Sequence, residues 1–466
     1  MIFEEITAKA IEIAEFEFAK VAKEKDIPGI SFGLVFNGDL VYSSGTGETE
    51  KGSGQKPSAN TVFRIASMTK SFTAQAILLL RDRGLLRLED DIEIYLPWAH
   101  GIGLPEGSQV ITIWDLLTMG AGLPTDDPWG DRQEDLPLEQ FDHLVGSGLT
   151  FNRPVNTGFE YSNLGYALLG RIIGVVSGEE YEVFVQREII DPYGMKSTTF
   201  FTERVSDANR AHGYVNFPSG KEKVPPVQTG AFTPMGGLHS TVGDITRWVA
   251  HFQSGQFEAQ TPARHIQSAL VPAEGEIPAR ILVSHYGYGI FISDDAELGR
   301  FTSHSGGYPG FGSHMRWHKE SGWGIVALAN LTYAPMSTTS AQVLNQIAWM
   351  DKKNSHRGPE LHDATRHAIG VVEGLLRQWD DGLADQNFAI NMDFDCPRQD
   401  RKAEFEKVGT ELGELFRLEG SLTSNAKSHV KWKVVGNGKM YQIELIVSPE
   451  KSPKVQKVVL KLIEEI

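Results

Sequence analysis

The sequence predicts an α+β fold: an α/β sandwich in which helices flank an antiparallel sheet, with a mainly helical insertion and a small C-terminal α+β domain. Apolar residues alternate strictly over 30–36 and end at Asn37-Gly38, a type I′ turn signal, with a return strand at 40–42. Strand-like runs come back only near residue 300, after a long stretch of helical pattern. A polar segment at 351–359 then separates this region from a further group of helices and strands.

The first elements are assigned from periodicity and turn residues. Residues 4–24 carry the mixed apolar and charged faces of an amphipathic helix. A second helix is expected from Ser67 to Arg83, stopped by Gly84. Residues 67–285 are predicted to be mainly helical with long loops. The Pro-, Asp- and Gly-rich stretch 124–154 is expected to border a site and to contain a short helix.

Three later runs complete the predicted sheet. They span residues 300–303, 312–318 and 324–328, with turns expected at 306–310 and 320–322, and residues 337–350 suit a final helix packed on the sheet. These strands should join the N-terminal hairpin in one antiparallel sheet. The helical region is then an insertion, and the site lies between the sheet and the helices.

This pattern divides the chain into a main domain at 1–350, a linker at 351–359 and an accessory domain at 360–466. In the accessory domain, helices are expected at 364–378 and 398–413, and strands at 431–435, 439–447 and 455–463. No set of catalytic side chains is recognisable there. Capping the site of the main domain and mediating self-association into a homo-oligomer both stay open as its role.

Composition narrows the classes of function. The 466-residue chain has a formal net charge of −16, and phosphate binding needs clustered Lys and Arg, so no nucleic-acid partner is expected. Its single cysteine, Cys396, allows no internal disulfide. The first residues lack a signal-peptide pattern, and no run of about 18 apolar residues could span a membrane. We expect a cytoplasmic protein without a membrane partner, or an exported one if a leader was removed.

The segment Ser67-Met68-Thr69-Lys70 carries the strongest chemical signal. A serine followed three residues later by a lysine on a helix puts both side chains on one face. A neutral lysine can take the serine proton, which makes a nucleophile without histidine. The N–H groups and dipole at the helix N-terminus would stabilise a developing oxyanion.

Two further segments add to this signal. In Tyr161-Ser162-Asn163, a tyrosine close to ammonium groups can have a lowered pKa and act as a base. The Asn163 amide can accept from Lys70 and donate to a substrate carbonyl. In the third segment, His304-Ser305-Gly306-Gly307, the glycine pair lets a substrate lie along a strand edge, and Gly307 N–H could join that of Ser67 in an oxyanion hole.

This set resembles the penicillin-binding protein and class C β-lactamase superfamily, which carries Ser-x-x-Lys, Tyr-x-Asn or Ser-x-Asn, and Lys-Thr-Gly or His-x-Gly. The resemblance covers roughly residues 10–350. It implies that Ser67 is the acylated nucleophile, that Lys70 and Tyr161 share general-base work, and that Tyr161 carries the proton to the leaving group. It also implies that Asn163 positions the substrate and that His304 holds the third-motif position.

Two departures from the family pattern stand out. His304 replaces the lysine with which β-lactamases hold a carboxylate, and histidine is a weaker carboxylate anchor at neutral pH. This lowers the expectation of β-lactam hydrolysis, because relatives with His-x-Gly are mostly esterases, D-aminopeptidases and acyltransferases. Met119-Gly120-Ala121 stands where the family more often has His-Thr-Ser, and the sequence offers no reason for this change.

Other motifs have plainer interpretations. His304, His314 and His318 lie on neighbouring strand-like runs but lack further ligands at zinc-like spacing, so no metal or cofactor is expected. The Gly-x-Ser-x-Gly string at 29–33 lies within a predicted strand, so it is not the strand-to-helix elbow of an α/β-hydrolase. The acyl pocket is expected from the loop 120–157 and from residues around Gly236 and Tyr308.

The patterns therefore predict a serine hydrolase that forms an acyl-enzyme on Ser67. The expected substrate is a small-molecule ester or a D-amino-acid-containing peptide or amide, and β-lactamase or D-Ala-D-Ala carboxypeptidase activity is the alternative. An alternative of another class is a non-catalytic protein that binds β-lactams or peptidoglycan fragments as a sensor. The intact Ser67, Lys70 and Tyr161 argue against it, as does the lack of a membrane tether.

Overall fold

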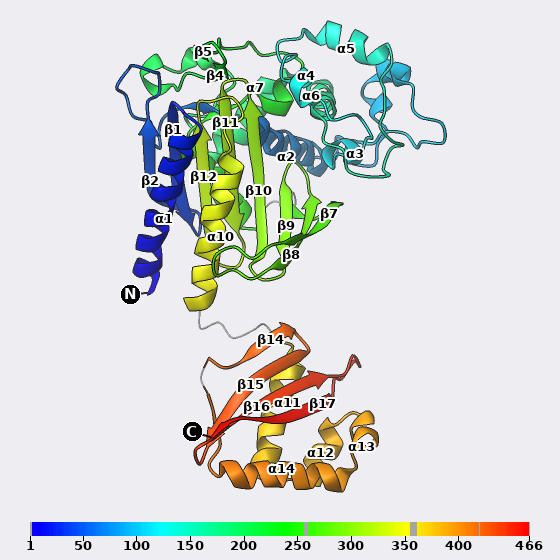
Figure 1. Ribbon diagram of the computed structural model, residues 1–466. Coiled ribbons are helices and arrows are strands. Elements are labelled where there is room, and N and C mark those ends of the chain that lie inside the picture. The colour runs from blue at the N-terminus through cyan, green and yellow to red at the C-terminus, as the bar shows by residue number, and fades with distance from the viewer. Residues whose placement is uncertain (1, 256–259, 355–360, 419, 466) are drawn as a thin grey trace. The chain divides into compact units, whose positions relative to one another are not determined.

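The computed structural model describes residues 2–255, 260–354, 361–418 and 420–465. The chain forms two compact units, Met1–Asn354 and Ser355–Ile466 (Figure 1). Both combine antiparallel sheet with helices, which confirms the predicted α+β class. Among the described residues, no helix is both long enough and apolar enough to cross a membrane.

An eight-stranded antiparallel sheet forms the centre of the first unit. Its strands follow the order β2-β1-β12-β11-β10-β9-β8-β7. Their bounds are β1 Gly29–Phe36, β2 Asp39–Gly47, β7 Arg264–Val271, β8 Arg280–Tyr286, β9 Phe291–Asp295, β10 Gly299–Tyr308, β11 Phe311–His318 and β12 Trp323–Ala329. The N-terminal hairpin pairs with β12 through β1, so the two ends of this unit meet in one sheet as predicted. Asn37 and Gly38 both have positive φ in the hairpin turn.

Two predictions about this sheet are wrong. Strands β7 and β8 lie almost wholly within residues 67–285, which were predicted to be mainly helical with long loops, and β9 was not foreseen. Side chains of the edge strand β7 are largely exposed, so it lacks the apolar alternation that marks a half-buried strand. Gly306 and Gly307 were expected in a turn, but β10 continues through them to Tyr308.

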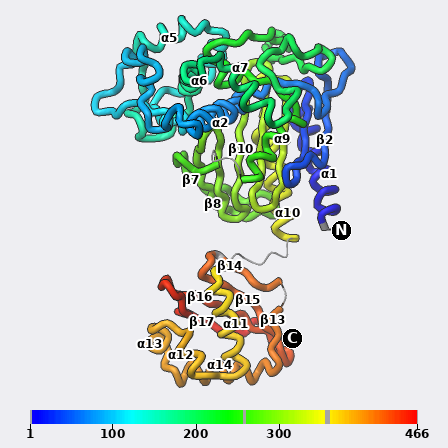
Figure 2. Tube along the Cα trace, turned by 180° about the vertical axis from the view of Figure 1, so that it is seen from behind, coloured from blue at the N-terminus to red at the C-terminus, as the bar shows by residue number. Residues whose placement is uncertain are grey.

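Helices cover both faces of the sheet. Helices α1 (Ile2–Glu24) and α10 (Met336–Asn354) lie on one face, and α2 (Thr69–Asp82) and α9 (Val242–Gln253) lie on the other (Figures 1 and 2). Phe18 of α1 stacks on Phe32 of β1 at 4.4 Å, and Phe72 of α2 stacks on Trp248 of α9 at 4.1 Å. Because α10 runs to Asn354, the first residues of the predicted linker are helical, and residues 355–359 lie outside the described residues.

The inserted region supplies the helices above the site. These are α3 Ile113–Leu117, α4 Asp127–Gly130, α5 Leu138–Gly146, α6 Asn163–Ser177, α7 Tyr181–Val185 and α8 Thr233–Gly236. Two short strand pairs lie outside the main sheet: β3 (Phe63–Arg64) pairs with β6 (His239–Ser240), and β4 (Tyr214–Phe217) pairs with β5 (Gly220–Lys223). Helix α6 packs so closely on α8 that a Cβ added at Gly170 would lie 2.0 Å from Pro234. Helix α2 packs against both α6 and α8, so the three helices meet.

The second unit has its own core around the buried Trp432. Its elements are α11 Asp363–Arg377, α12 Asp381–Asn387, α13 Asn391–Asp395, α14 Arg398–Leu412, β13 Phe416–Arg417, β14 Thr423–Ala426, β15 His429–Gly436, β16 Lys439–Val447 and β17 Val455–Glu465. The predicted helices and three strands are present, while α12, α13, β13 and β14 were not foreseen.

Candidate active site

Ser67 lies in a short 3-10 turn, Ala66–Met68, between β3 and α2. The α-helix begins at Thr69, two residues later than predicted. Ala66 has φ +46°, a left-handed conformation that is uncommon outside glycine and often found at functional sites. Ala66 and Met68 are buried, whereas Ser67 is only half-buried. The turn therefore keeps the hydroxyl accessible on an otherwise buried segment.

Lys70 is fully buried and donates to three oxygen atoms. Its Nζ lies 3.0 Å from Ser67 Oγ, 2.7 Å from Asn163 Oδ1 and 2.8 Å from the Met235 carbonyl oxygen. Burial lowers the pKa of Lys70 to about 8, although the carboxylates of Asp127, Asp126 and Asp131 act in the opposite direction. The lysine thus loses its proton far more readily than an exposed one.

Tyr161 lies two residues before Asn163, the first residue of α6. Its hydroxyl is hydrogen-bonded with the Ser67 side chain, and Lys70 Nζ lies 5.0 Å from the centre of its ring. Burial, followed by the Asp127 carboxylate, raises the pKa of Tyr161 well above its usual value. The predicted lowering of this pKa is therefore wrong for the resting protein, and Tyr161 is a neutral hydroxyl that can relay a proton.

Asn163 is oriented by two carboxylates that sequence reasoning missed. Asp126 accepts hydrogen bonds from the backbone N–H groups of Asn163 (2.6 Å) and Leu164 (2.8 Å) at the start of α6. Asp127 Oδ1 accepts from Asn163 Nδ2 at 2.8 Å. The amide nitrogen thereby faces Asp127 and the amide oxygen faces Lys70. The adjacent acidic pair Asp126-Asp127, inside the loop expected to border the site, was the available signal.

His304 is buried on β10, with both ring nitrogens engaged inside the protein. The Ser305 carbonyl oxygen accepts from Nδ1 at 2.6 Å, so Nε2 is free to accept from the Tyr286 hydroxyl at 3.1 Å. Burial, followed by the charge of Lys70, lowers the pKa of His304 to about 3. His304 is accordingly neutral, and neither nitrogen is available to anchor a substrate carboxylate.

Gly306 and Gly307 allow β10 to run close to the serine segment. A Cβ on Gly306 would lie 2.1 Å from the Ile65 carbonyl oxygen, two residues before Ser67. Ser313 of β11 donates to the same carbonyl at 2.7 Å. A Cβ on Gly307 would lie 2.4 Å from the ring of Tyr333. The backbone clash at Gly306 requires glycine there, whereas a side chain at Gly307 would displace the Tyr333 ring. The structure places this end of β10 beside the Ser67 turn.

Asp131 and Tyr333 connect the helical region to the sheet. The Tyr333 hydroxyl, on the loop after β12, donates to Asp131 Oδ2. Asp131 is only 5% exposed, and burial raises the pKa of its carboxyl to about 6. Sequence reasoning missed both residues, because 202 positions separate them and neither belongs to a recognised motif.

A buried arginine on β7 accounts for Gly120 in the unusual Met119-Gly120-Ala121 segment. Arg264 donates to the Thr118 carbonyl oxygen at 3.1 Å and lies 3.5 Å from Asp115 Oδ1. A Cβ on Gly120 would lie 1.9 Å from the Arg264 guanidinium. Glycine is therefore required at position 120 because the arginine side chain fills the space that a larger residue would need.

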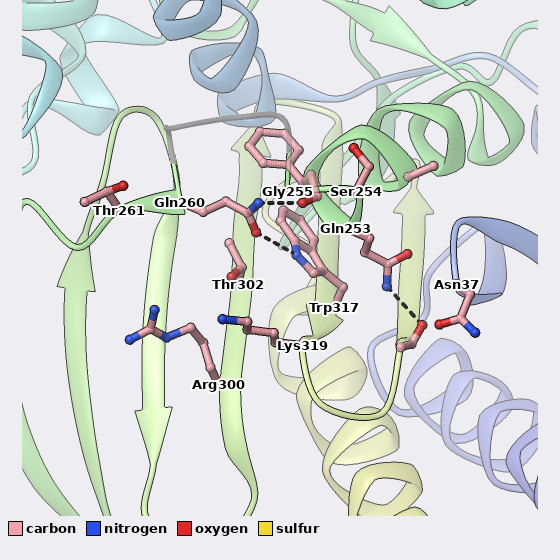
Figure 3. Close-up of a pocket in the computed structure, with 13 residues that line it drawn as sticks. Asn37, Gln253, Ser254, Gly255, Gln260, Thr261, Arg300, Thr302, Trp317 and Lys319 are labelled. Atoms are coloured by element: carbon pink, nitrogen blue, oxygen red, sulfur yellow. Dashed lines mark hydrogen bonds between the residues drawn. The ribbon is translucent and has the colours of Figure 1, made fainter.

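A separate cavity of about 430 Å³ lies at the other end of the sheet. Figure 3 shows Gln253 at the end of α9 and the following Ser254 on one side of it, and Arg300, Thr302 and Trp317 of the sheet on the other. None of the seven residues predicted for the active site lines this cavity. The seven residues lie instead around Lys70 and the Gly306–Gly307 end of β10.

A serine held against a buried lysine, beside a Tyr-x-Asn segment and a glycine-containing strand, is the arrangement of a serine hydrolase of the β-lactamase and penicillin-binding-protein type. A profile of the Beta-lactamase family matches residues 14–347, and the chain belongs to this family. The family resemblance noted from the motifs is thereby confirmed.

Individual relatives share about 30% of their residues with this chain. Penicillin-binding protein 4* of Bacillus subtilis (strain 168) is 31% identical over 292 residues, which are 60% of this chain and 62% of that protein. Protein flp of Staphylococcus aureus (strain NCTC 8325 / PS 47) is 28% identical over 329 residues, 68% of this chain and 64% of that protein. The chain thus spans a little under two thirds of the length of these relatives.

Two solved structures share the fold. The octameric penicillin-binding protein homologue from Pyrococcus abyssi superposes with a TM-score of 0.62 at 22% identity, covering 97% of this chain and 95% of that one. A class C β-lactamase superposes with a TM-score of 0.57 at 20% identity, covering 72% of this chain and 96% of that one.

Proposed function

We propose that this protein hydrolyses small esters or D-amino-acid-containing peptides and amides through an acyl-enzyme on Ser67. The observation that carries the proposal is the 3.0 Å contact between Ser67 Oγ and a buried Lys70 whose pKa is about 8. A lysine of this kind is neutral in a substantial fraction of molecules near pH 7.5 and can accept the serine proton.

Acylation would begin when Ser67 Oγ adds to the substrate carbonyl carbon and its proton passes to neutral Lys70. The N–H groups of Ser67 and Gly307 would hold the carbonyl oxygen as it becomes an oxyanion. The bond to the leaving group then breaks, and the neutral Tyr161 hydroxyl, hydrogen-bonded with Ser67, would relay a proton from Lys70 to the leaving oxygen or nitrogen. Asn163 keeps Lys70 in place through the 2.7 Å contact with Oδ1.

Deacylation would follow the same path in reverse. Water adds to the acyl carbon, gives its proton to the Tyr161 and Lys70 pair, and the ester bond to Ser67 breaks with return of a proton to Oγ. The products are a carboxylic acid and the free enzyme. Residues that bind water or exclude it would set the balance between hydrolysis and transfer to another acceptor.

β-Lactam hydrolysis or D-Ala-D-Ala carboxypeptidase activity is the second candidate, and the similarity to penicillin-binding protein 4* favours it. These substrates carry a carboxylate that needs a cation near the third motif. His304 is neutral and both its ring nitrogens are engaged, so the described residues of that motif offer no such cation. We therefore rank this activity below ester and amide hydrolysis.

Covalent labelling tests the proposal and separates it from a non-catalytic binding protein. Intact mass would be measured after brief exposure to p-nitrophenyl butyrate and an acid quench. We expect a butyryl adduct on the wild type, none on Ser67→Ala, and p-nitrophenol release only from the wild type. Wild-type protein that neither forms an adduct nor releases p-nitrophenol would contradict the ester activity, and binding of β-lactams without turnover would favour a sensor.

We also propose that the chain self-associates through the Ser355–Ile466 unit. The Pyrococcus abyssi homologue described as octameric matches this chain over 97% of its length. Ile390 and Phe394 in this unit are 81% and 82% exposed, which is unusual for large apolar side chains. Light scattering on the full chain and on an Ile390→Asp, Phe394→Asp variant tests this. A monomeric wild type, or a variant that keeps the wild-type mass, would contradict it.

A further inference from the structure

An aromatic cluster lies on the side of the candidate site that carries Tyr161. The ring of Phe291, at the start of β9, stacks on Tyr161 with the ring centres 6.4 Å apart, and it lies 5.3 Å from the ring of His304. Phe159 lies 6.4 Å from Phe291 and 5.7 Å from Tyr286. His304 and Tyr286 are buried, whereas the other three rings are half-buried. A bound molecule therefore meets this cluster at Phe159, Tyr161 and Phe291.

The aromatic cluster is uncharged near neutral pH. Burial lowers the pKa of His304 to about 3 and raises the pKa values of Tyr161 and Tyr286 well above their usual value. Glu160, the neighbour of Tyr161 in the sequence, is paired with Arg153 at 2.8 Å. A charged group placed against the cluster would lose hydration and gain no ionic partner from its members.

Tyr161 determines which part of a substrate meets the cluster. In the proposed reaction, the bond between the acyl carbon and the leaving oxygen or nitrogen breaks, and the Tyr161 hydroxyl relays a proton to that leaving atom. This hydroxyl is hydrogen-bonded with the Ser67 side chain. The leaving atom must therefore come within hydrogen-bond reach of Tyr161. The group attached to the leaving atom then lies beside the Phe291 ring, which stacks on Tyr161.

We infer that Phe159 and Phe291 form the leaving-group subsite, and that this subsite selects uncharged leaving groups with an aromatic or other bulky apolar body. The inference rests on the proposed acyl-enzyme function and specifies one half of its substrate. Contacts between rings and burial of apolar surface favour such a leaving group over a small one. Esters of arylmethyl alcohols have this chemistry, whereas a leaving group with a carboxylate beside the departing atom lacks it.

Butyrate esters of different alcohols test this selection. Methyl and benzyl butyrate share the acyl part, and their alcohols have nearly equal acidity, so the two leaving groups are matched in reactivity. We expect kcat/KM of the wild type to favour the benzyl ester by about tenfold or more. Carboxymethyl butyrate, whose leaving group carries a carboxylate, should be hydrolysed about tenfold more slowly than the benzyl ester. Titration of the butyric acid released measures all three rates.

Variants separate the two rings from the rest of the site. In Phe159→Ala and Phe291→Ala the ratio of kcat/KM for benzyl and methyl butyrate should fall by about fivefold or more, and Phe291→Leu should retain most of it. Phe36→Ala is the matched control, because this half-buried ring packs on Phe3 and Trp323 and should leave the ratio unchanged. The ratio is taken within each variant, so a general loss of activity or stability cancels.

Acyl transfer examines the same subsite in the reverse direction. An alcohol that replaces water attacks the butyryl-enzyme from the position that the leaving group has vacated, and it gives up its proton along the same relay. With p-nitrophenyl butyrate as the acyl donor, benzyl alcohol should form benzyl butyrate in about tenfold higher yield than methanol forms methyl butyrate at the same concentration. Chromatography of the two esters measures the yields on the wild type alone.

Equal turnover of benzyl and methyl butyrate, a preference for the carboxymethyl ester, or equal transfer to the two alcohols would overturn the subsite and leave the Ser67 mechanism intact. A ratio that stays at the wild-type value in both Phe159→Ala and Phe291→Ala would do the same. If none of these esters and no p-nitrophenyl butyrate is hydrolysed, and no adduct forms on Ser67, the proposed function itself fails, and the inference with it.

Discussion

Lys70 Nζ lies 3.0 Å from Ser67 Oγ, and the lysine side chain is completely buried. Burial of an ammonium group is unfavourable, and the three oxygen acceptors around it offset only part of the cost. The result is a lysine with a pKa near 8 in direct contact with the candidate nucleophile. Burial by the fold thus lowers the pKa of the lysine that is proposed to accept the Ser67 proton.

The rate should depend on pH through Lys70. Only the neutral amine can accept the serine proton, so kcat/KM for p-nitrophenyl butyrate should rise with pH and level off above about 8. Lys70→Ala should lower kcat/KM by about 10³-fold and abolish this rise. Initial rates from pH 6 to 9, corrected with Ser67→Ala, provide the measurement. A wild-type profile that stays flat through pH 8 would contradict the role of Lys70.

Removal of the Tyr161 hydroxyl should affect catalysis more than stability. Tyr161→Phe should lower kcat by about 10² to 10³-fold, because the proton relay to the leaving group is lost. The matched control is Tyr42→Phe, since this hydroxyl of β2 donates to Glu15 of α1 at 2.6 Å, away from the candidate site. It should lower the melting temperature and leave kcat within a fewfold of the wild type. Equal losses of kcat in the two variants would argue against a proton relay.

Gly120 and Arg264 should be coupled in stability. Gly120→Ala forces the new Cβ into the guanidinium, so we expect a loss of about 2 to 4 kcal/mol. The same substitution made in Arg264→Ala should cost less, with a coupling energy of about 1 kcal/mol or more. Gly174→Ala in α6 is the control, because its Cβ would meet only ordinary contacts. Additive losses at the two positions, measured by thermal unfolding, would show that the arginine does not require the glycine.

Asp131 should make the first unit less stable at neutral pH than in mild acid. Its pKa is about 6 in the folded protein against an ordinary value of 3.8, so the folded state binds more protons between these values. Stability contributed by this group therefore falls as pH rises from about 4 to about 6, by at most about 3 kcal/mol. Asp131→Asn removes the penalty.

The melting temperature of Asp131→Asn should accordingly exceed that of the wild type at pH 7.5. The difference should shrink towards pH 4, where the wild-type carboxyl is protonated. Differential scanning calorimetry across this range gives the comparison. A variant that is less stable than the wild type at pH 7.5 would mean that the Tyr333 contact needs the charged carboxylate.

Local spacing explains why part of the site could be predicted. Ser67 and Lys70 are three residues apart, and any helical turn brings such side chains together whatever the rest of the fold does. Asn163 follows Ser162, whose hydroxyl caps α6, so its place at a helix start is also a local property. The N-terminal hairpin was predicted for the same reason, because Asn37 and Gly38 tolerate positive φ.

Long-range contacts explain what could not be predicted. Strand β7 forms at the sheet edge through pairing with β8, although its own side chains show no apolar alternation. The direction of the Tyr161 pKa shift also depends on burial, which the sequence does not reveal.

The sequence by itself determined the family, the order of the motifs and the candidate nucleophile with its neighbouring lysine, because these depend on residue type and short spacing. Only the tertiary structure decided the charge of the site. Folding neutralises His304, lowers the pKa of Lys70, and places Asp131 against Tyr333 from 202 positions away. Electrostatics depends on distance and burial in three dimensions, so the charge states of these groups became visible only once the chain was folded.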